Sequence, residues 1–491
     1  MASRLSSLNG SVGASIDWFD SVFDAVLRIV RNQMCSVVFL CFVMVPNCTI
    51  AKDGDYVKGA TGESIREFVE LVHERLGFSG VVLAGRDGNV VAEIARGESD
   101  ATTKKQLHSS TLFEIASCTK SFTAIAILRL AEEGKLSLDD LISKHLPGIP
   151  SNCNAITIRH LLMHTSGIPG SNTSGSGDDV TKVIPTFLSG GPKVPPGQRH
   201  EYWNQGYALL SEIVARASDR PYTDSLRALI FDPCQMHVTR FTGDSASGDL
   251  DVAVGLSTRG ASRSALEHPY GSYGFQYRGT GGIVTNIQDL WKWDRALADG
   301  KLLTNESLRE MVKPGPGDYA LGWKVRKATD GTDCHYHSGG VRGFVSQIQR
   351  IPSIDGALFL LSNQEDTLPL TILQEGIERI LFGKPVDIVL PSAPDPKLLT
   401  GMMGEYIDSK NRKLVIAKGT GLPTVRVYWG GPVTNGYLGI ANDGQLHLFI
   451  LDMADRRIRF KDDGALKFSP ATERATSVSM MGLTPPLVFE R

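Results

Sequence analysis

The chain reads Phe113-Glu-Ile-Ala-Ser117-Cys-Thr-Lys120-Ser-Phe-Thr123 at the start of its most regular apolar pattern, residues 117–134. That spacing predicts a helix that ends at a glycine. A serine and a lysine three positions apart lie on one face of a helix, so Ser117 and Lys120 should be neighbours. A desolvated lysine loses its charge more easily and could take a proton from the serine. The pair predicts a serine nucleophile, although a capping serine beside an exposed lysine is the simpler interpretation of one such match.

A second informative segment covers residues 195–207 and reads Pro-Pro-Gly-Gln-Arg-His-Glu-Tyr202-Trp-Asn204-Gln-Gly-Tyr. It places Tyr202 and Asn204 in a loop just before a helical pattern at residues 206–217. Taken alone, a tyrosine is usually a core or surface aromatic residue, and an asparagine before a helix is usually its cap. The two residues become informative only beside the first segment.

A third segment, His337-Ser-Gly339-Gly340, comes just before a β-rich run at residues 344–351. A glycine at this place would let a substrate lie against the edge of the strand, because no side chain intervenes. A free backbone N–H there could also face an oxyanion. We therefore include Gly339 and Gly340 with His337 as candidate substrate-binding residues.

In this order, the three segments resemble the motifs of the β-lactamase and penicillin-binding-protein superfamily of serine hydrolases, in its class-C-like branch. The related class A signature is Ser-x-x-Lys with Ser-Asp-Asn and Lys-Thr-Gly, whereas this chain has Tyr-x-Asn second and His-Ser-Gly third. Tyr-x-Asn is similar to the class C β-lactamases and to the D-alanyl-D-alanine carboxypeptidases and esterases related to them. The histidine resembles carboxypeptidase and esterase members more than true class C β-lactamases.

Further segments extend the resemblance from about residue 61 to residue 383. Residues 158–169 resemble the family's helix-ending segment LLxHTSGLP, residues 281–290 resemble its segment GGLxSTxxDL, and residues 319–323 and 360–363 resemble the strands around the third motif. His164 lies in the first of these, where a helix should end. We expect its side chain to bind the free carbonyl groups of that helix and to take no part in catalysis.

The resemblance implies a role for each catalytic candidate. Ser117 would be the acylated nucleophile, and Lys120 beside it would be the proton acceptor or relay. Tyr202 would be the general base that exchanges protons with the nucleophile, the leaving group and the deacylating water. The implied reaction uses neither a metal ion nor a cofactor.

The resemblance also implies how the substrate is bound. Asn204 would orient the substrate amide and the catalytic lysine. His337 would face a substrate carboxylate or hold the catalytic tyrosine in place, next to Gly339. The backbone N–H groups of Gly340 and of the nucleophile would form the oxyanion hole.

Strand patterns open and close the region between residues 61 and 383, and helical patterns with long loops fill its middle. A helix comes first, then two strands whose Asp-Gly step predicts a hairpin, and three late strands, at residues 64–76, 80–84, 90–94, 321–326, 344–351 and 357–362. We therefore expect an α+β fold for residues 61–383. It would be β-lactamase/transpeptidase-like, with an antiparallel sheet flanked by helices and a helical insertion.

A proline-rich stretch at residues 384–397 predicts a linker. The following region, residues 398–491, contains short β-rich runs with turn glycines between several of them. These runs predict a C-terminal all-β, barrel-like domain with strands at residues 414–417, 425–429, 446–451, 458–460 and 466–468. Residues 1–60 remain as a leader.

The leader contains nine consecutive apolar residues, 37–45, between a serine and a proline. This run is too short to span a bilayer but fits the apolar centre of a secretory signal. We expect export to the periplasm or to the outside of the cell, with anchoring or weak association with a membrane through this segment as the alternative. The preceding residues carry no net charge, so Met34 is an alternative start, and residues 16–30 could form an amphipathic helix instead.

Composition excludes several other classes of protein. The chain has 491 residues, a net charge of −2 and 42% hydrophobic residues, which is ordinary globular composition. Without a basic surplus, the sequence gives no electrostatic reason to expect nucleic acid as a partner. The seven cysteines form no C-x-x-C pair, and His335 and His337 have no third ligand nearby, so we expect no metal site.

We therefore expect an enzyme that transfers acyl groups through Ser117 and acts on a small molecule or a peptide. Peptides of D-amino acids and small esters are the favoured substrates, because the histidine and the appended β-domain resemble D-aminopeptidase-like and esterase-like relatives. β-Lactams are the alternative substrates. The competing hypothesis is a non-catalytic envelope or scaffold protein that keeps the penicillin-binding fold.

Overall fold

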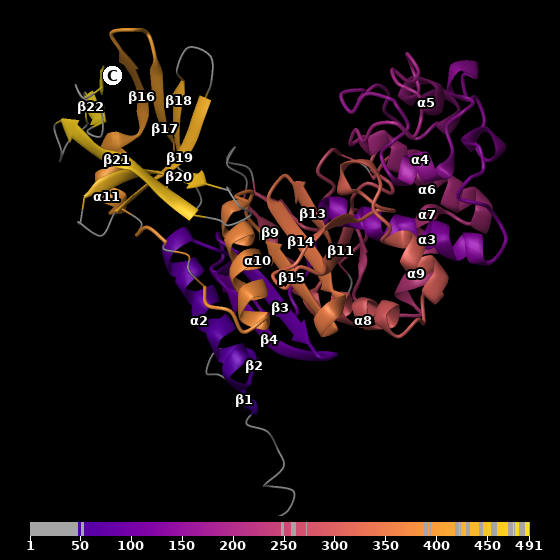
Figure 1. The fold of residues 1–491 in the computed structure, drawn as a ribbon, viewed down its shortest axis with the longest axis horizontal. Helices are drawn as coiled ribbons and strands as arrows, with labels where there is room; N and C mark the ends of the chain where they lie inside the picture. Colours follow the sequence, from indigo (N-terminus) through magenta and orange to yellow (C-terminus); the bar gives the residue numbers. More distant parts are fainter. Residues whose placement is uncertain are drawn as a thin grey trace, which may run out of the picture. The chain divides into compact units, whose positions relative to one another are not determined.

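A computed structural model gives the fold (Figure 1). It describes residues 48–50, 54–246, 250–256, 262–271, 273–386, 388, 390–392, 394–417, 422, 424–428, 433–440, 445–452, 459–469, 475, 477–480 and 487–490. The apolar run at residues 37–45 and the rest of the expected leader up to residue 47 lie outside the described residues. Among the residues described, no helix is both long enough and apolar enough to cross a membrane.

An antiparallel sheet carries the region that contains the three motifs. Its strands run in the order β2-β4-β3-β15-β14-β13-β12. Their bounds are β2 (Tyr56–Lys58), β3 (Gly80–Arg86), β4 (Asn89–Arg96), β12 (Lys324–Lys327), β13 (Asp333–Val341), β14 (Phe344–Ile351) and β15 (Gly356–Ser362), and β1 (Cys48–Ile50) comes before them in the chain. Because β3 pairs with β15, with Gly80 opposite Ser362, the two ends of the region meet in the middle of the sheet.

The predicted hairpin between β3 and β4 is confirmed. Asp87 and Gly88 both have positive φ angles, 51° and 68°, as the tight turns of hairpins require. β12 begins at Lys324, three residues later than predicted. The reason is a turn at Gly322, which has a φ of +75°.

One face of the sheet is covered by α2 (Gly59–Leu76) and α10 (Leu368–Leu381), which also pack against each other (Figure 1). Side chains of β3 and β15 alternate between the two faces, as a strand buried on both sides requires. Val82 and Leu360 point to this face and share a core with the two helices.

The opposite face is covered by α3 (Thr119–Glu132) and α8 (Ile287–Ala298). Val81 and Leu361 point to this face and join the core of these helices. The nucleophile segment comes just before α3 in the chain, so the candidate active site belongs to this side of the sheet.

Short helices and small sheets fill the helical insertion. The helices are α4 (Ile158–Leu162), α5 (Val180–Phe187), α6 (Asn204–Ser218), α7 (Tyr222–Leu226) and α9 (Asn305–Met311). The small sheets pair β7 (Phe113–Glu114), β11 (Ile283–Thr285) and β8 (Arg240–Phe241), then β5 (Glu98–Asp100) with β6 (Lys105–Gln106), and β9 (Val254–Gly255) with β10 (Arg263–Ser264). The expected α+β class with a helical insertion is confirmed.

The C-terminal region forms a closed antiparallel barrel, which confirms the expected barrel-like class. Its strands follow α11 (Pro396–Met402) and are β16 (Gly404–Asp408), β17 (Lys413–Ala417), β18 (Thr424–Tyr428), β19 (Val433–Ile440), β20 (Leu446–Asp452), β21 (Arg459–Ser469), β22 (Ser477–Met480) and β23 (Leu487–Glu490). The barrel has a core of its own, which includes Tyr406, Leu414 and Phe489. Two separate runs were expected here, but residues 459–460 and 466–468 lie in one strand, β21.

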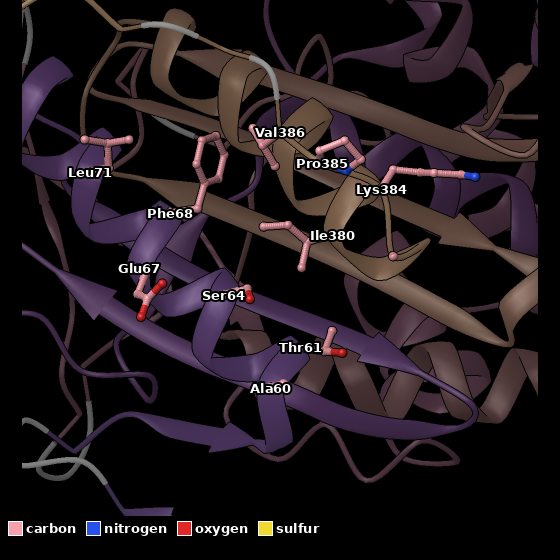
Figure 2. A pocket seen from close by; sticks show the side chains of 11 residues that line it. Ala60, Thr61, Ser64, Glu67, Phe68, Leu71, Ile380, Lys384, Pro385 and Val386 are labelled. Atoms are coloured by element: carbon pink, nitrogen blue, oxygen red, sulfur yellow. The ribbon is translucent and has the colours of Figure 1, made fainter.

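A groove of about 550 Å³ runs beside α2 (Figure 2). It is lined by residues of α2, by the end of α10 and by the residues after it, namely Ala60, Thr61, Ser64, Glu67, Phe68, Leu71, Ile380, Gly383, Lys384, Pro385 and Val386. Since α2 and α10 lie on the face of the sheet opposite α3, this groove is separate from the candidate active site.

Candidate active site

Ser117 lies in a short 3-10 turn, Ala116–Cys118, between β7 and α3. The residue before it, Ala116, has a φ of +45°, a conformation that residues with a Cβ atom rarely adopt. Ala116 and Cys118 are buried, whereas Ser117 between them is partly exposed. The turn therefore presents the Ser117 hydroxyl at the surface of a segment that is otherwise in the core.

The sheet holds this turn in place. The Ser346 hydroxyl on β14 donates a hydrogen bond of 2.8 Å to the Ile115 carbonyl, just before the turn. Gly339 on β13 lies so close that a Cβ atom there would clash with the Ile115 carbonyl and the Ser346 hydroxyl. The third motif therefore needs a glycine at position 339 because the nucleophile turn packs against the strand.

Lys120 lies within hydrogen-bonding distance of the nucleophile. Its Nζ donates hydrogen bonds to Ser117 Oγ and to the Thr280 carbonyl, both at 3.1 Å. The side chain is fully buried, and both of its acceptors are neutral oxygens. Burial is the main reason that the pKa of Lys120 is lowered to about 7, and the positive charge of Lys324 adds to this effect. A large fraction of the amine is therefore neutral near pH 7 and able to accept a proton.

Tyr202 lies beside the same lysine. Lys120 Nζ is 4.9 Å from the centroid of the Tyr202 ring. Burial raises the pKa of Tyr202, and a hydrogen bond with Ser117 acts in the opposite direction. The phenol is thus protonated in the resting protein, where its hydroxyl is able to donate a hydrogen bond.

His337 is buried in β13 and held by two hydrogen bonds. Its Nδ1 lies 2.8 Å from the Ser338 carbonyl, which can only accept, so the ring proton is on Nδ1. Its Nε2 then accepts from the Tyr319 hydroxyl at 3.0 Å. Burial, with the nearby charge of Lys120, lowers the pKa of His337 to about 3. The ring is therefore neutral at physiological pH and offers no positive charge to a substrate carboxylate.

The remaining candidates differ in their surroundings. Gly340 has open space where a Cβ atom would be, so a substrate could approach the backbone there. Asn204 is the first residue of α6 and is exposed. Among the described residues no hydrogen bond joins Asn204 to Lys120. Ser117, Lys120, Tyr202 and His337 are thus brought together, while no described contact joins Asn204 to them.

Sequence reasoning did not assign three contacts of this site. The Thr280 carbonyl binds Lys120, and the Tyr319 hydroxyl binds His337. The ring of His164 lies 4.2 Å from that of Tyr202, measured between centroids. Each lies in or next to a segment that resembles the family, which is the signal that could have revealed it.

The interpretation of His164 as a helix cap is wrong for its side chain. The ring nitrogen Nδ1 accepts a hydrogen bond of 3.1 Å from the Trp203 backbone N–H, 39 residues later in the chain. Because Nδ1 accepts this bond it carries no proton, so it cannot bind a helix carbonyl, which also only accepts. The other ring nitrogen, Nε2, is buried without a hydrogen-bond partner among the described residues. The ring therefore binds the Tyr202 loop, not the end of α4.

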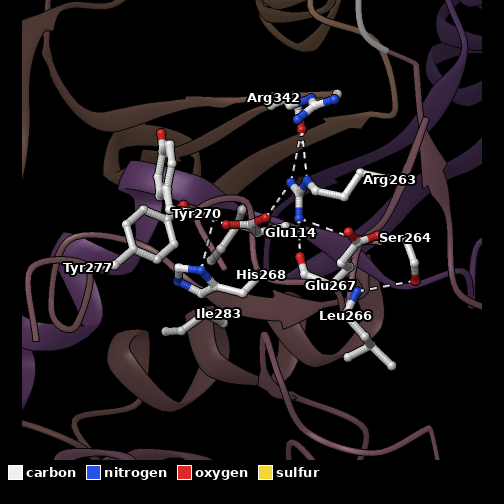
Figure 3. A network of polar contacts seen from close by, with 12 residues as sticks. Glu114, Arg263, Ser264, Leu266, Glu267, His268, Tyr270, Tyr277, Ile283 and Arg342 are labelled. Atoms are coloured by element: carbon white, nitrogen blue, oxygen red, sulfur yellow. Dashed lines mark hydrogen bonds and ion pairs between the residues drawn. The ribbon is translucent and has the colours of Figure 1, made fainter. Parts of the chain in front are cut away.

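A buried ion pair between Glu114 and Arg263 lies in the segment just before the nucleophile turn in the chain (Figure 3). Glu114 on β7 accepts hydrogen bonds from Arg263 Nη2 and from the Tyr277 hydroxyl, both at 2.6 Å. Arg263 also donates to the carbonyl of Arg342, at 2.9 and 3.1 Å, in the turn between β13 and β14. The pair therefore connects the strand before Ser117 with the turn after the third motif.

We expect the rate of acylation to depend on the protonation of Lys120. Below its pKa of about 7 the amine is an ammonium ion and cannot accept the Ser117 proton. The rate should therefore be constant above about pH 8 and fall about tenfold per pH unit well below the pKa. The measurement is the second-order rate of labelling by a neutral fluorophosphonate probe between pH 5 and pH 9.

Two further observations would show that this pH dependence comes from Lys120. His337 does not titrate in this range, because its pKa is lowered to about 3. Lys120→Met should remove the dependence together with most of the labelling. A wild-type rate that stays constant from pH 5 to pH 9 would show that Lys120 is not the proton acceptor.

Comparisons with known proteins identify the family of the chain. A profile of the family described as Beta-lactamase matches residues 65–375. Penicillin-binding protein 4* of Bacillus subtilis is 30% identical over 378 residues, which cover 70% of this chain and 82% of that protein. The matched profile spans all three motifs.

Solved structures of similar fold include a penicillin-binding protein homologue and an amidase. The D-amino acid amidase from Ochrobactrum anthropi SV3 is 25% identical, with a TM-score of 0.55, and the match covers 66% of this chain and 98% of that one. The octameric penicillin-binding protein homologue from Pyrococcus abyssi has a TM-score of 0.59 at 22% identity and covers 87% and 99%. At that identity the second match shows the fold alone. From the profile, the relative and the fold together, the chain belongs to the Beta-lactamase family, within the superfamily of β-lactamases and penicillin-binding proteins.

Proposed function

We propose that the protein is a serine hydrolase that cleaves amides or esters through an acyl-enzyme at Ser117. The observation that carries this proposal is the buried Lys120, whose Nζ lies 3.1 Å from Ser117 Oγ and whose pKa is lowered to about 7. A structural lysine in the core would be expected to have a carboxylate partner, whereas this one is positioned to take a proton. Membership of the family supports serine-hydrolase activity in general.

The reaction follows from the positions of the groups. Ser117 Oγ attacks the substrate carbonyl carbon while its proton moves to Lys120 Nζ. The negative oxygen of the tetrahedral intermediate would be bound by the backbone N–H groups of Ser117 and Gly340. The proton then passes through Tyr202 to the leaving amine or alcohol, and an acyl ester remains on Ser117. Water hydrolyses this ester by the same transfers in reverse, which restores the free enzyme.

The neutral His337 bears on the class of substrate. A peptide with a free C-terminal carboxylate, or a penicillin, would gain no ion pair from the neutral His337 ring, so the cation would have to come from another side chain, such as Lys324 on β12. This favours amides of D-amino acids and small esters over substrates that carry a carboxylate at that end. The D-amino acid amidase among the similar structures is consistent with such a substrate.

A turnover panel tests this proposal. We expect hydrolysis of p-nitrophenyl esters and of a D-amino-acid amide, slower cleavage of a D-Ala-D-Ala peptide, and the slowest reaction with a chromogenic cephalosporin. Tyr202→Phe keeps the ring and removes only the hydroxyl, so it tests the relay, and it should lower turnover of every substrate. Absence of turnover, together with absence of labelling by a fluorophosphonate, would instead support the non-catalytic scaffold.

A further inference from the structure

We propose that His164 is a positioning residue that fixes Tyr202 by binding the backbone on both sides of it. This role rests on the proposed function, because Tyr202 is there the proton relay. Tyr202 lies outside helices and strands, in the loop that ends at α6. A residue in such a loop needs other contacts to hold its side chain within the short distance that proton transfer demands.

Two hydrogen bonds from His164 bracket Tyr202. The His164 carbonyl accepts from the Glu201 N–H at 2.8 Å. The His164 ring accepts from the Trp203 N–H, through Nδ1, at 3.1 Å. One residue therefore binds the backbone immediately before and immediately after Tyr202, which fixes the direction in which the tyrosine side chain leaves the chain.

The conformation of His164 makes both bonds available at once. Its φ angle is +53°, in the left-handed region, two residues after the end of the short helix α4. Its own N–H is bound to the Leu161 carbonyl at 3.2 Å, which anchors it to α4. The left-handed turn is thus an unusual backbone conformation held at a site of proposed chemistry, where such strain is commonly found.

The ring also packs directly on the tyrosine. The centroid of the His164 ring is 4.2 Å from that of Tyr202, with Tyr319 at 4.8 Å and Tyr207 at 5.1 Å. The nearby titratable groups are Lys120, His200, His337 and these three tyrosines; burial is the main cause that lowers the pKa of His164, and the charge of Lys120 adds to it. The ring is therefore neutral, with its proton on Nε2, and Nδ1 stays free to accept.

Two substitutions separate the hydrogen bond from the backbone strain. His164→Asn puts an amide oxygen close to the position of Nδ1, and asparagine tolerates a positive φ. His164→Gly also tolerates a positive φ but offers no acceptor to Trp203. Both variants remove the ring, so the pair differs mainly in the bond that the proposal invokes.

We expect His164→Gly to lower kcat on a p-nitrophenyl ester about 10- to 100-fold with little change in KM, since a misplaced relay slows the chemical step. His164→Asn should recover most of the lost rate. In a Tyr202→Phe background, His164→Gly should cause little additional loss, because the group that it positions has been removed. Equal losses in both backgrounds, or an asparagine variant as slow as the glycine variant, would overturn the proposal.

A second measurement does not depend on activity. Hydrogen exchange of the Trp203 amide should be faster in His164→Gly than in the wild type, while His164→Asn should keep the amide protected. Unchanged exchange in His164→Gly would contradict the positioning role even if the protein hydrolysed no substrate. Failure of the turnover panel with the expected exchange pattern would overturn the proposed function and leave the structural role of His164 standing.

Discussion

Replacing Ser117 with alanine is expected to abolish covalent labelling and to lower ester turnover by at least about 10⁴-fold. The hydroxyl is the partly exposed group in its turn, and Lys120 Nζ lies 3.1 Å from it. Without Oγ no acyl-enzyme can form, and what remains is the acceleration that a bound substrate gains from the surrounding hydrogen-bond donors. The measurement is the intact mass of the protein after reaction with a fluorophosphonate.

The wild type should gain the mass of one probe molecule, and Ser117→Ala should gain none. Ser110→Ala is the matched control, because Ser110 is exposed and lies seven residues earlier in the same segment. This variant should be labelled like the wild type. An adduct on Ser117→Ala at the wild-type rate would place the nucleophile elsewhere and contradict the proposed function.

The pairing of Ser117 with Lys120 could be predicted from local spacing, and the structure shows why. The two residues are three positions apart in the chain, so the first turn of α3 brings their side chains together even though Ser117 itself is in a 3-10 turn. The lowered pKa of Lys120 could not be predicted in the same way. It depends mainly on burial by the whole fold, and the charge of Lys324, 204 residues later in the chain, adds to it.

The contact between Tyr202 and this pair is not local either. Nothing in the spacing of residues 195–207 places the tyrosine 4.9 Å from Lys120, and only the resemblance to a family predicted it. The hydrogen-bond partner of the His164 ring could not be predicted for the same reason. A histidine after a helix pattern favours a local cap, and the true partner is a backbone N–H from another segment.

Only part of the sheet could be predicted from sequence, because its strands differ in their pattern of apolar and polar residues. β15 is an apolar run, β14 has apolar residues at both ends and in its middle, and the hairpin of β3 and β4 has an Asp-Gly turn, so these strands could be predicted from sequence. β13 was missed. It contains two histidines and two glycines, residues without a clear alternation of apolar and polar side chains, and it is a strand because β12 and β14 pair with it on both sides.

The largest expected effect on stability comes from Arg263→Met. The side chain of Arg263 is 3% exposed and that of Glu114 is fully buried, so the substitution leaves a carboxylate in the core without its partner. Breaking such a pair costs about 3–5 kcal/mol, a large part of the 5–15 kcal/mol that typically stabilises a domain. Methionine keeps part of the packing on Phe344, over whose ring the guanidinium lies at 5.0 Å. The denaturant midpoint of unfolding is the measurement.

The matched control is Arg278→Met. Arg278 pairs with Asp178 at 3.2 Å, and the two side chains are 34% and 58% exposed. An ion pair in contact with water contributes no more than about 1 kcal/mol, so this variant should unfold near the wild-type midpoint. Similar losses in the two variants would contradict the role of the buried pair.

The stability that Arg263→Met loses should depend on pH. Burial already raises the pKa of Glu114 in the folded protein, and the charge of Arg263 opposes that shift. Without Arg263 the folded-state pKa rises further above the unfolded value, so the folded protein holds the proton more tightly and loses stability as pH rises. The destabilisation should therefore be smaller at pH 5 than at pH 8. Adding Glu114→Met to Arg263→Met should restore part of the stability at pH 8, because the uncompensated buried charge is then gone.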